Sequence, residues 1–449
     1  MKLYKTCEFE RTKLEALLAK PAFDEVRLGK KAQDKLQSLF GESLTAVQAV
    51  ERIVSEVRCG GDAAVLSFTE RIDGITFATS DWRVSESEVA DAYEKADPKV
   101  IASLRKAIAN VKRFHEEQRP KSWLTEREKG AMLGQKVSPI GRVGIYVPGG
   151  TASYPSSVIM NAIPAMVAGV EEIIMAVPPG PGGKINDYVL IAAKESGVDR
   201  IFKMGGAQAI AALAFGTESV PRVDKITGPG NLFVTLAKKA VYGHCDIDML
   251  AGPSEILIVA DDSADACYVA ADLLSQAEHD VLAGSILITD SLRLAKEVLL
   301  ELERQLELLP RKEMAKQSLE NNGLVLVVDN IEEAMELANL AAPEHLEILV
   351  ADPWSQLSAV KNAGAVFLGP YSPEPLGDYW AGPNHVLPTG GTARFYSVLN
   401  VETFMKKTSI IAYTQAALAE VSDDIIRLAE AEGLTAHANA VRVRRERDV

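Results

Sequence analysis

Short apolar segments alternate with helical patterns and glycine-rich turns over residues 140–239, and the same alternation returns over residues 255–369. Strands that alternate with helices pair in parallel, because each helix carries the chain back across the sheet and covers one of its faces. The apolar segments are "RVGIYV", "EEIIMAV", "RIFKM" and "VDKIT", and then "EILIVA", "SILITD", "LVLVVD", "LEILV" and "AVFLG". The sequence therefore predicts an α/β protein with two Rossmann-like, incomplete parallel-sheet domains.

Helical segments flank these two runs on both sides. Residues 1–120 place apolar residues at intervals of three and four, as in "LTAVQAVERIVSEVR", which is typical of amphipathic helices. Beyond residue 400 the pattern becomes helical again, with Gly433 at the break between two short helices. We expect an N-terminal helical segment over 1–25, an interleaved α/β domain over 26–133 and 240–390, a Rossmann-like domain over 134–239, and a C-terminal helical tail over 391–449. Since the tail has little core of its own, we expect it to dock on the body of the chain or on a partner subunit.

Charge and cysteine content exclude several classes of protein. The 449 residues include 48 Lys and Arg against 62 Asp and Glu, for a net charge of −14, whereas nucleic-acid binding needs a concentrated basic surface. The four cysteines are widely spaced without a CxxC pair, which fits a reducing compartment. No stretch reaches the roughly 18 consecutive apolar residues that cross a membrane, and the N-terminus lacks the apolar core of a signal peptide. We expect a cytoplasmic protein that binds neither nucleic acid nor membrane.

Three glycine-rich turns follow predicted strands of the first run: "YVPGGTASYPSS" (146–157), "MGGAQA" (204–209) and "TGPGNLF" (227–233). Parallel sheets bind ligands at the carboxyl ends of their strands, and glycines let the backbone approach a ligand closely. The helix after each turn presents free N–H groups that suit phosphate oxygens. Each turn alone is more often only a turn, but three in one domain favour a dinucleotide ligand. Neither GxGxxG nor GxxxxGK followed by Ser or Thr occurs, so the standard nucleotide fingerprints are absent.

Two polar side chains lie at the end of the helix predicted within "DLLSQAEHD" (272–280). Gln276 and His279 are three residues apart, so they share a helix face with Cβ atoms roughly 5–6 Å apart, close enough to contact one ion. Alone, such a histidine more often belongs to the core or the surface. Similar polar, turn-rich segments contain His345, His385 with Asp378 nearby, and His437. Nitrogen and oxygen donors without thiolates suit zinc, or manganese or cobalt in its place.

The segment "PEHLE" places Glu344 and His345 side by side after a proline, at the start of a predicted strand. Adjacent residues on extended chain point in opposite directions, so the two side chains are not expected to hydrogen-bond to each other. Instead they can flank a substrate at the strand entrance as a general acid and base. An isolated dipeptide of this kind is more often structural, but the candidate metal and nucleotide sites favour the acid/base role.

Several long segments, in order over residues 134–442, resemble the histidinol dehydrogenase family. They are "GRVGIYVPGGTASYPSSVIMNAIPA", "GGAQAIAALAFGTESVPRVDKITGPGN", "DMLAGPSEILIVAD", "LLSQAEHD", "APEHLE", "GDYWAGPNHVLPTGGTARF" and "EGLTAHANAV". The resemblance implies a zinc- and NAD-dependent enzyme that oxidises L-histidinol to L-histidine through L-histidinaldehyde, the last two oxidations of histidine biosynthesis. It also implies a homodimer with shared active sites and one zinc ion per subunit. On this basis residues 134–239 bind NAD, the interleaved domain carries the metal and acid/base residues, and the tail docks on the partner subunit.

The resemblance further assigns roles to individual residues. Glu344 and His345 become the acid/base pair. The expected NAD contacts are Tyr146, Gln208 and Asn231; the zinc ligands are Gln276, His279, Asp378 and His437; and the substrate contacts are Ser254, Gln276, His279, His345, Asp378, Glu432 and His437. Of these, His437 is expected to come from the partner subunit. The remaining candidate, His385, either supports the metal ligands or stabilises the "GPNHVLPT" turn, and the sequence favours the turn.

Other functions fit parts of the pattern. A related zinc and NAD dehydrogenase would act on another amino or sulfonated alcohol, although "EGLTAH" and "PTGGTARF" favour histidinol. A zinc hydrolase also needs a metal with Glu and His, but HExxH is absent and the glycine-rich turns would have no purpose. A non-catalytic metabolite-binding protein predicts loss of the Glu344 and His345 pair or of the ligand set, and neither is lost.

Overall fold

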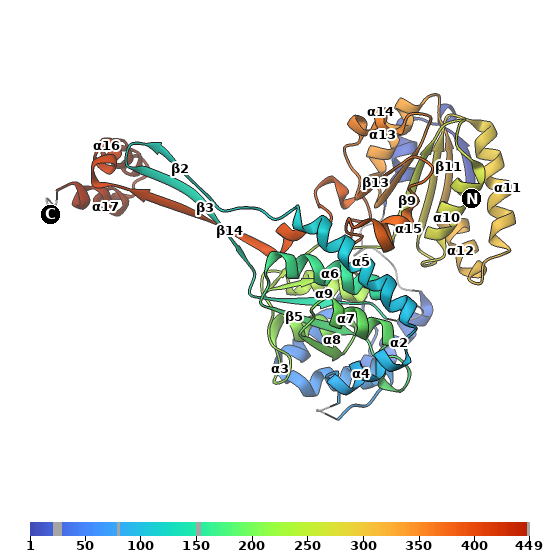
Figure 1. Ribbon diagram of the computed structural model, residues 1–449, viewed down its shortest axis with the longest axis horizontal. Helices are drawn as coiled ribbons and strands as arrows, with labels where there is room; N and C mark the ends of the chain where they lie inside the picture. The colour runs from blue at the N-terminus through green and yellow to red at the C-terminus, as the bar shows by residue number, and fades with distance from the viewer. Residues whose placement is uncertain (21–28, 79–80, 150–153, 447–449) are drawn as a thin grey trace. The chain divides into compact units, whose positions relative to one another are not determined.

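The computed structural model describes residues 1–20, 29–78, 81–149 and 154–446 (Figure 1). Its contacts divide the chain into two units, one made of residues 1–118 and 141–404 and the other of residues 119–140 and 405–449. The first unit contains two parallel sheets with their helices, which confirms the predicted α/β class. The domain boundary predicted at residues 25 and 26 lies outside the described residues. Within the described ranges, no helix is both long and apolar enough to span a bilayer.

The first parallel sheet has five strands in the order β6-β5-β4-β7-β8. They are β4 (Arg142–Tyr146), β5 (Glu172–Val177), β6 (Arg200–Lys203), β7 (Lys225–Thr227) and β8 (Asp246–Ile247), joined by α6 (Pro155–Ala168), α7 (Asp187–Glu195), α8 (Gly206–Phe215) and α9 (Leu232–Val241). The strand order reverses between β4 and β7, where Ile145 pairs with Thr227. Doubly wound sheets bind ligands at the carboxyl ends of the strands at such a reversal. Tyr146 and the turn after Thr227 stand at this point.

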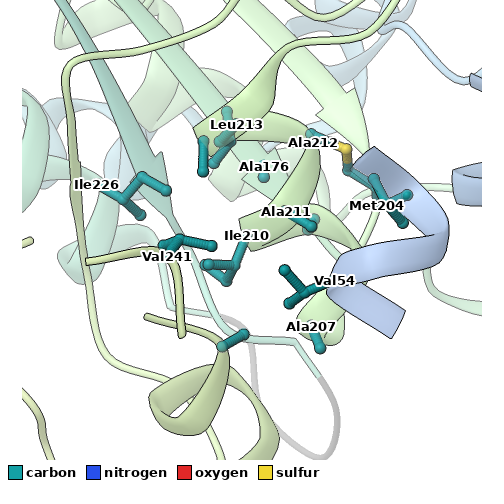
Figure 2. Close-up of a cluster of buried hydrophobic side chains, with 14 of the residues drawn as sticks. Val54, Ala176, Met204, Ala207, Ile210, Ala211, Ala212, Leu213, Ile226 and Val241 are labelled. Carbon is teal, nitrogen blue, oxygen red and sulfur yellow. The ribbon is translucent and has the colours of Figure 1, made fainter. Parts of the chain in front are cut away.

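Helix α3 (Ala46–Asp73) packs its apolar face into the core of this first sheet. Its N-terminus is stabilised by a capping box between Thr45 and Gln48. Figure 2 shows Val54 of α3 in one cluster with Ala207 of α8 and with Met204, the residue that follows β6. The structure differs here from the expected grouping of residues 26–133 with 240–390. The helical period of α3 predicts an apolar face, but it does not predict which of two sheets that face covers.

Two more helices follow α3 in this part of the chain and one precedes it. They are α2 (Lys30–Phe40), α4 (Glu86–Lys95) and α5 (Pro98–Glu116). Asp97 caps α5, whose first residue is Pro98, a residue suited to the first turn of a helix. The helical character predicted for residues 1–120 is thus confirmed for most of the described residues.

The second parallel sheet has six strands in the order β1-β11-β10-β9-β12-β13. They are β1 (Lys2–Lys5), β9 (Glu255–Ala260), β10 (Gly284–Thr289), β11 (Gly323–Val327), β12 (His345–Leu349) and β13 (Ala365–Leu368). Leu257 and Val259 pack into one core and Ile256 and Ile258 into another, because successive side chains leave a strand on opposite faces. Burial of both faces explains why these strands read as unbroken apolar runs.

Helices cover both faces of the second sheet. They are α1 (Arg11–Leu18), α10 (Ala266–Ala277), α11 (Leu292–Leu306), α12 (Lys312–Asn322) and α13 (Ile331–Ala341), with the short α14 (Pro353–Gln356) and α15 (Glu374–Leu376). The prediction of a purely helical segment over 1–25 is wrong at its start, where Lys2 to Lys5 form β1 beside β11. Four residues are too short to show a strand period, and only the neighbouring strand makes them one.

The second unit combines an antiparallel sheet with two helices. The sheet order is β14-β3-β2, with β2 (Trp123–Glu128), β3 (Ala131–Pro139) and β14 (Met405–Tyr413), and the helices are α16 (Gln415–Ala431) and α17 (Thr435–Glu446). The helices and the break at Gly433 (φ +73°) were expected for the tail and are confirmed. The expectation that the whole of 391–449 is helical is wrong over β14. Most of β14 is exposed on both faces, so its sequence lacks the alternation that predicts a strand.

A buried ion pair holds the turn that follows β7. Lys238 Nζ donates to the carbonyl of Gly228 (3.0 Å) and pairs with Asp248 Oδ1, while Asp248 Oδ2 accepts from the Gly228 N–H (2.8 Å). The two charged side chains are only 3% and 1% exposed. Gly228 has φ +113°, and a Cβ there would lie 2.1 Å from the carbonyl oxygen of Tyr146. The turn therefore requires glycine and depends on the Lys238–Asp248 pair for its shape.

Replacing Lys238 by methionine would leave Asp248 as a buried charge without its cation. We expect Lys238→Met to lower the free energy of unfolding by about 3–5 kcal/mol, the usual cost of breaking a buried pair on one side. Urea-induced unfolding measures this loss. Arg304→Met breaks an exposed pair with Glu301 and should leave the stability almost unchanged. If Lys238→Met and Arg304→Met unfolded at the same urea concentration, the stabilising role of the Lys238–Asp248 pair would be contradicted.

Candidate active site

The residues predicted as the acid/base pair lie at the start of β12, beside the start of β9. The two strands are parallel, and His345 stands opposite Ile256 in the register. Glu344 and His345 are both only 5% exposed. The pair therefore lies at the amino ends of the strands of the second sheet, at the strand entrance expected from the sequence.

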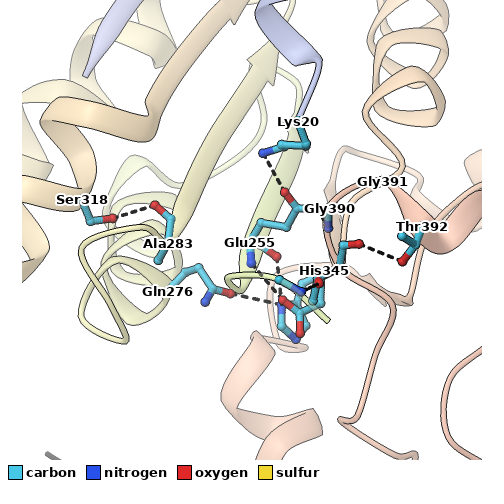
Figure 3. A network of polar contacts seen from close by, with 12 residues as sticks. Lys20, Glu255, Gln276, Ala283, Ser318, His345, Gly390, Gly391 and Thr392 are labelled. Carbon is cyan, nitrogen blue, oxygen red and sulfur yellow. Dashed lines mark hydrogen bonds and ion pairs between the residues drawn. The ribbon is translucent and has the colours of Figure 1, made fainter. Parts of the chain in front are cut away.

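The backbone of Glu255 contacts both members of the pair. Its N–H donates to Glu344 Oε2 (2.9 Å), and its carbonyl oxygen lies 3.0 Å from His345 Nδ1 (Figure 3). His345 Nδ1 also lies 3.1 Å from Gln276 Oε1. A carbonyl oxygen only accepts, so Nδ1 carries the proton and Nε2 keeps a free lone pair. The nearest approach of the pair itself, from His345 Nδ1 to Glu344 Oε2, is 3.8 Å, too long for a hydrogen bond.

Burial changes the acid strength of both groups. It lowers the pKa of His345 to about 4, so the ring is neutral near pH 7. It raises the pKa of Glu344 well above its usual value, although the hydrogen bond from Glu255 acts in the opposite direction. A neutral imidazole is able to accept a proton, and a carboxylate of raised pKa is a stronger base than one in water.

The chain enters β12 through a constrained turn. Ala342, which follows α13, has φ +48°, a left-handed conformation that costs energy in any residue with a Cβ. The N–H groups of Gly364 and Ala365 then donate to the carbonyls of Pro343 and Glu344, each at 2.9 Å. A Cβ on Gly364 would lie 2.6 Å from the Glu344 oxygen, so glycine is required there. Strands β9 and β13 thus hold the pair from both sides.

A group of potential metal ligands lies close by. One ligand atom each from His279, Glu374 and Asp378 lies within 4.8 Å of the others. Gln276 is fully buried, and its Nε2 has no hydrogen-bond partner within the described part of the chain. His279 follows the end of α10, where its N–H donates to the Gln276 carbonyl (3.2 Å). The donors are nitrogen and oxygen atoms, so the residues present fit a zinc ion.

Neighbouring residues support these ligands. Burial would raise the pKa of Asp378, but His385, whose Nδ1 lies 3.2 Å from Asp378 Oδ1, lowers it to about 2. His385 thus contacts one of the expected metal ligands, and its role remains a prediction. Burial, followed by the charge of Asp378, raises the pKa of Glu374 to about 9. An oxygen of Glu374 lies within 4.8 Å of one of Asp378, and the Glu374 N–H donates to Glu347 Oε1 (2.9 Å).

The sequence predictions missed Glu374 and Glu255. Glu374 stands four residues before Asp378 in "PEPLGDYW", a spacing that brings side chains to one helical face. Glu255 begins the apolar strand "EILIVA", where a buried carboxylate is unusual. Each of these two sequence features indicates a residue that needs a specific partner. Only the folded structure shows which residue that partner is.

The residues predicted to contact NAD lie at the carboxyl ends of the first sheet. Tyr146 is the last residue of β4, and its buried hydroxyl accepts from the Gly206 N–H (3.1 Å) at the start of α8. Burial raises the pKa of Tyr146 to about 12, so its hydroxyl keeps a proton to donate. Gln208 is fully buried, and neither of its side-chain polar atoms has a partner in the described ranges. Asn231 caps α9, with Oδ1 accepting from the Phe233 N–H (3.0 Å).

These positions fit a nucleotide, because the unpartnered buried amide of Gln208 needs a polar ligand. Residues 150–153 of the first glycine-rich turn lie outside the described residues. Of the predicted substrate contacts, Ser254 is half-buried and directly precedes Glu255. Glu432 and His437 are exposed in the second unit, at the end of α16 and in α17, and their part in the site remains a prediction.

Comparison with known proteins decides the family. The sequence pattern of histidinol dehydrogenase matches residues 41–445. The chain belongs to the histidinol dehydrogenase family. It is therefore an oxidoreductase.

Individual members of the histidinol dehydrogenase family agree over most of the chain. The histidinol dehydrogenase of Heliobacterium mobile is 58% identical over 93% of this chain and 97% of its own length. That of Carboxydothermus hydrogenoformans is 55% identical over 88% of this chain and 93% of its own. The crystal structure of histidinol dehydrogenase from Elizabethkingia anophelis is 36% identical and has a TM-score of 0.90, covering 99% of this chain and 98% of that one.

Removing the support of Asp378 should weaken metal binding. Glu374→Leu removes the carboxyl group beside Asp378 while leaving Gln276, His279 and Asp378 in place. We expect zinc affinity to fall by about 10- to 100-fold, as is usual when a residue that orients a ligand is lost. Titration of the protein with zinc in the presence of a competing chelator measures this affinity. Glu374→Gln still offers a hydrogen bond and should bind zinc more tightly than Glu374→Leu; unchanged affinity in Glu374→Leu would contradict the role.

Proposed function

We propose that this protein oxidises L-histidinol to L-histidine through L-histidinaldehyde, with NAD as the hydride acceptor and one zinc ion per subunit, as the last steps of histidine biosynthesis. The observation that carries the proposal is the buried His345, with Nδ1 turned to the Glu255 carbonyl, beside the donor group of His279 and Asp378. The names of the relatives and their similarity over nearly the whole chain support histidinol as the substrate.

The zinc ion would be held by Gln276, His279 and Asp378 together with the partner subunit's His437. When bound, zinc supplies a positive charge that anchors the nitrogen atoms of the substrate and has no redox chemistry of its own. The buried amide of Gln276 and the contacts of Asp378 with His385 Nδ1 (3.2 Å) and with the Glu374 carboxyl support this assignment, because they orient the donors in advance.

The dinucleotide would be held by Tyr146, Gln208 and Asn231. When bound, NAD supplies the acceptor for the hydride that leaves the substrate carbon. Support comes from the position of these residues around the carboxyl ends of the first sheet and from the unpartnered amide of Gln208. The remaining proposed contacts, Ser254 and Glu432, would orient the substrate.

The acid/base pair would act in sequence. His345 removes the hydroxyl proton of the alcohol through Nε2 as the carbon loses a hydride, which forms the aldehyde. Glu344 then takes a proton from a water molecule as its oxygen adds to the aldehyde carbon, and protonated His345 returns its proton to the former carbonyl oxygen, which forms the hydrate and frees Nε2 again. The hydrate then loses a second hydride from carbon and gives a hydroxyl proton to His345, which yields the carboxylic acid. The burial of both side chains supports these steps, because little competing water reaches them.

A homodimer is part of the same proposal. In the second unit, Trp123, Leu124 and Ile411 are 52%, 57% and 74% exposed, and exposed apolar side chains of this size are typical of a protein interface. Such a contact would bring Glu432 and His437 of one subunit to the site of the other. The cytoplasmic location and the absence of nucleic-acid or membrane partners remain predictions.

A direct assay tests the proposed function. Purified protein mixed with L-histidinol and NAD should reduce two NAD per histidinol, measured as absorbance of NADH, with L-histidine as the product. Removal of metal by a chelator should abolish turnover, and zinc should restore it. NADH formation with another amino or sulfonated alcohol but not with histidinol would contradict the substrate. Hydrolysis without NAD reduction would indicate a zinc hydrolase.

The roles of Glu344 and His345 should be distinguished by comparing oxidation of the aldehyde with its reduction. Glu344→Gln should slow oxidation of the aldehyde to the acid by about 10²- to 10⁴-fold, because only this half-reaction needs an activated water. Reduction of the aldehyde to the alcohol by NADH should be affected much less. His345→Asn should impair both directions with zinc content retained. His244→Asn, which changes an exposed histidine whose ring is tilted against that of Phe215, should impair neither. Equal losses in both directions for Glu344→Gln would exclude its water-activating role.

A further inference from the structure

We propose that Lys20 and Glu255 form a positioning pair that holds Glu344 and His345 in their working orientation. The inference rests on the proposed function, in which these two residues exchange protons with the substrate. Lys20 and Glu255 themselves take no part in proton transfer. They act through the backbone of Glu255, the first residue of β9.

At the start of β9, the backbone N–H and carbonyl of Glu255 form hydrogen bonds with the side chains of Glu344 and His345. The N–H of Glu255 donates to the Glu344 carboxylate, and its carbonyl accepts from His345 Nδ1. Both backbone groups of one residue therefore set the orientation of both proposed catalytic side chains. Rotation of the Glu255 peptide units would break both hydrogen bonds and leave Gln276 Oε1, 3.1 Å away, as the acceptor for His345 Nδ1–H, which weakens the preference for that tautomer.

The side chain of Glu255 is held as firmly as its backbone. Its Oε2 lies 2.6 Å from Lys20 Nζ, and its Oε1 accepts from the Gly390 N–H (3.2 Å). The side chain of Glu255 is 6% exposed and that of Lys20 is 23% exposed. A carboxylate this deeply buried requires a cation and hydrogen-bond donors, since its charge is otherwise strongly disfavoured.

Glu255 thereby joins three segments that are distant in the sequence (Figure 3). Lys20 follows α1, Gly390 belongs to the "PTGG" turn, and Thr389 of the same turn accepts from the Gly252 N–H just before β9. The segment "PTGGTARF" is one of those that resemble the family, but the resemblance assigns no role to its residues. We infer that its turn holds the Glu255 carboxylate through the Gly390 N–H. Without Lys20 the carboxylate would rotate toward water or toward another donor, and the first residue of β9 would move with it.

Four variants and one control test the pair by steady-state kinetics with L-histidinol and NAD. Lys20→Met and Glu255→Gln should each lower kcat by about 10-fold or more with KM for both substrates within about twofold, because small displacements of catalytic groups reduce rate more than binding. The double variant should be no slower than the slower single variant, since both changes break one interaction. Lys20→Arg should restore most of the rate. Lys312→Met, which breaks the exposed pair with Glu307, is the matched control and should have no effect.

A measurement without turnover separates this inference from the proposed function. The ring-nitrogen resonances of ¹⁵N-labelled histidine, assigned to His345 by His345→Asn, should show one Nδ1–H tautomer in the wild type and a mixture in Lys20→Met. Circular dichroism verifies that the variants are folded. The positioning role fails if Lys20→Met keeps both kcat and the single tautomer, or if the losses of the two single variants multiply in the double variant. If the wild type does not oxidise histidinol, the proposed function fails, and the tautomer comparison still decides whether the pair orients His345.

Discussion

The parallel pairing of β9 with β12 is the constraint on which the site depends. The register places His345 opposite Ile256, so that the backbone of Glu255 lies between the side chains of Glu344 and His345. A shift by one residue would turn every side chain of β12 to the other face and separate the pair from Gln276. The apolar residues of both strands, buried in two cores, set this register, so the stability of the sheet and the geometry of the site have the same origin.

The two parallel sheets offer opposite ends to their proposed ligands. The first sheet presents its carboxyl ends, with Tyr146 at the strand reversal, as doubly wound sheets usually do. The second sheet presents the amino ends of its strands. There the N–H of Glu255, at the start of β9, donates to the side chain of Glu344. The chain between β13 and the second unit joins the two, since Asn384 Nδ2 donates to the Met160 carbonyl of α6 (2.6 Å). The proposed oxidation by a dinucleotide needs such a connection, because hydride transfer requires both reactants in one place.

Buried polar groups at the site have partners that are distant in the sequence. Glu255 depends on Lys20, Asp378 on His385 and Glu374, and the turn at Gly228 on Lys238 and Asp248. A buried charge without a partner is costly, so these residues stabilise the fold only as pairs. Motif spacing predicted Gln276 with His279 and Glu344 with His345, because those partners are neighbours along the chain. It could not predict Glu374 or Glu255, whose partners are brought to them by the fold.

The sequence by itself determined the two α/β runs, their strands from "RVGIYV" to "AVFLG", the helices of residues 30–116 and the residues able to do chemistry, because local period and side-chain type are written in neighbouring residues. Only the tertiary structure decided which sheet α3 covers, that Lys2 to Lys5 and Met405 to Tyr413 are strands, and which groups surround the acid/base pair. Those outcomes depend on contacts between segments up to some 320 residues apart, such as that of Thr6 with Val327, and no local pattern encodes them.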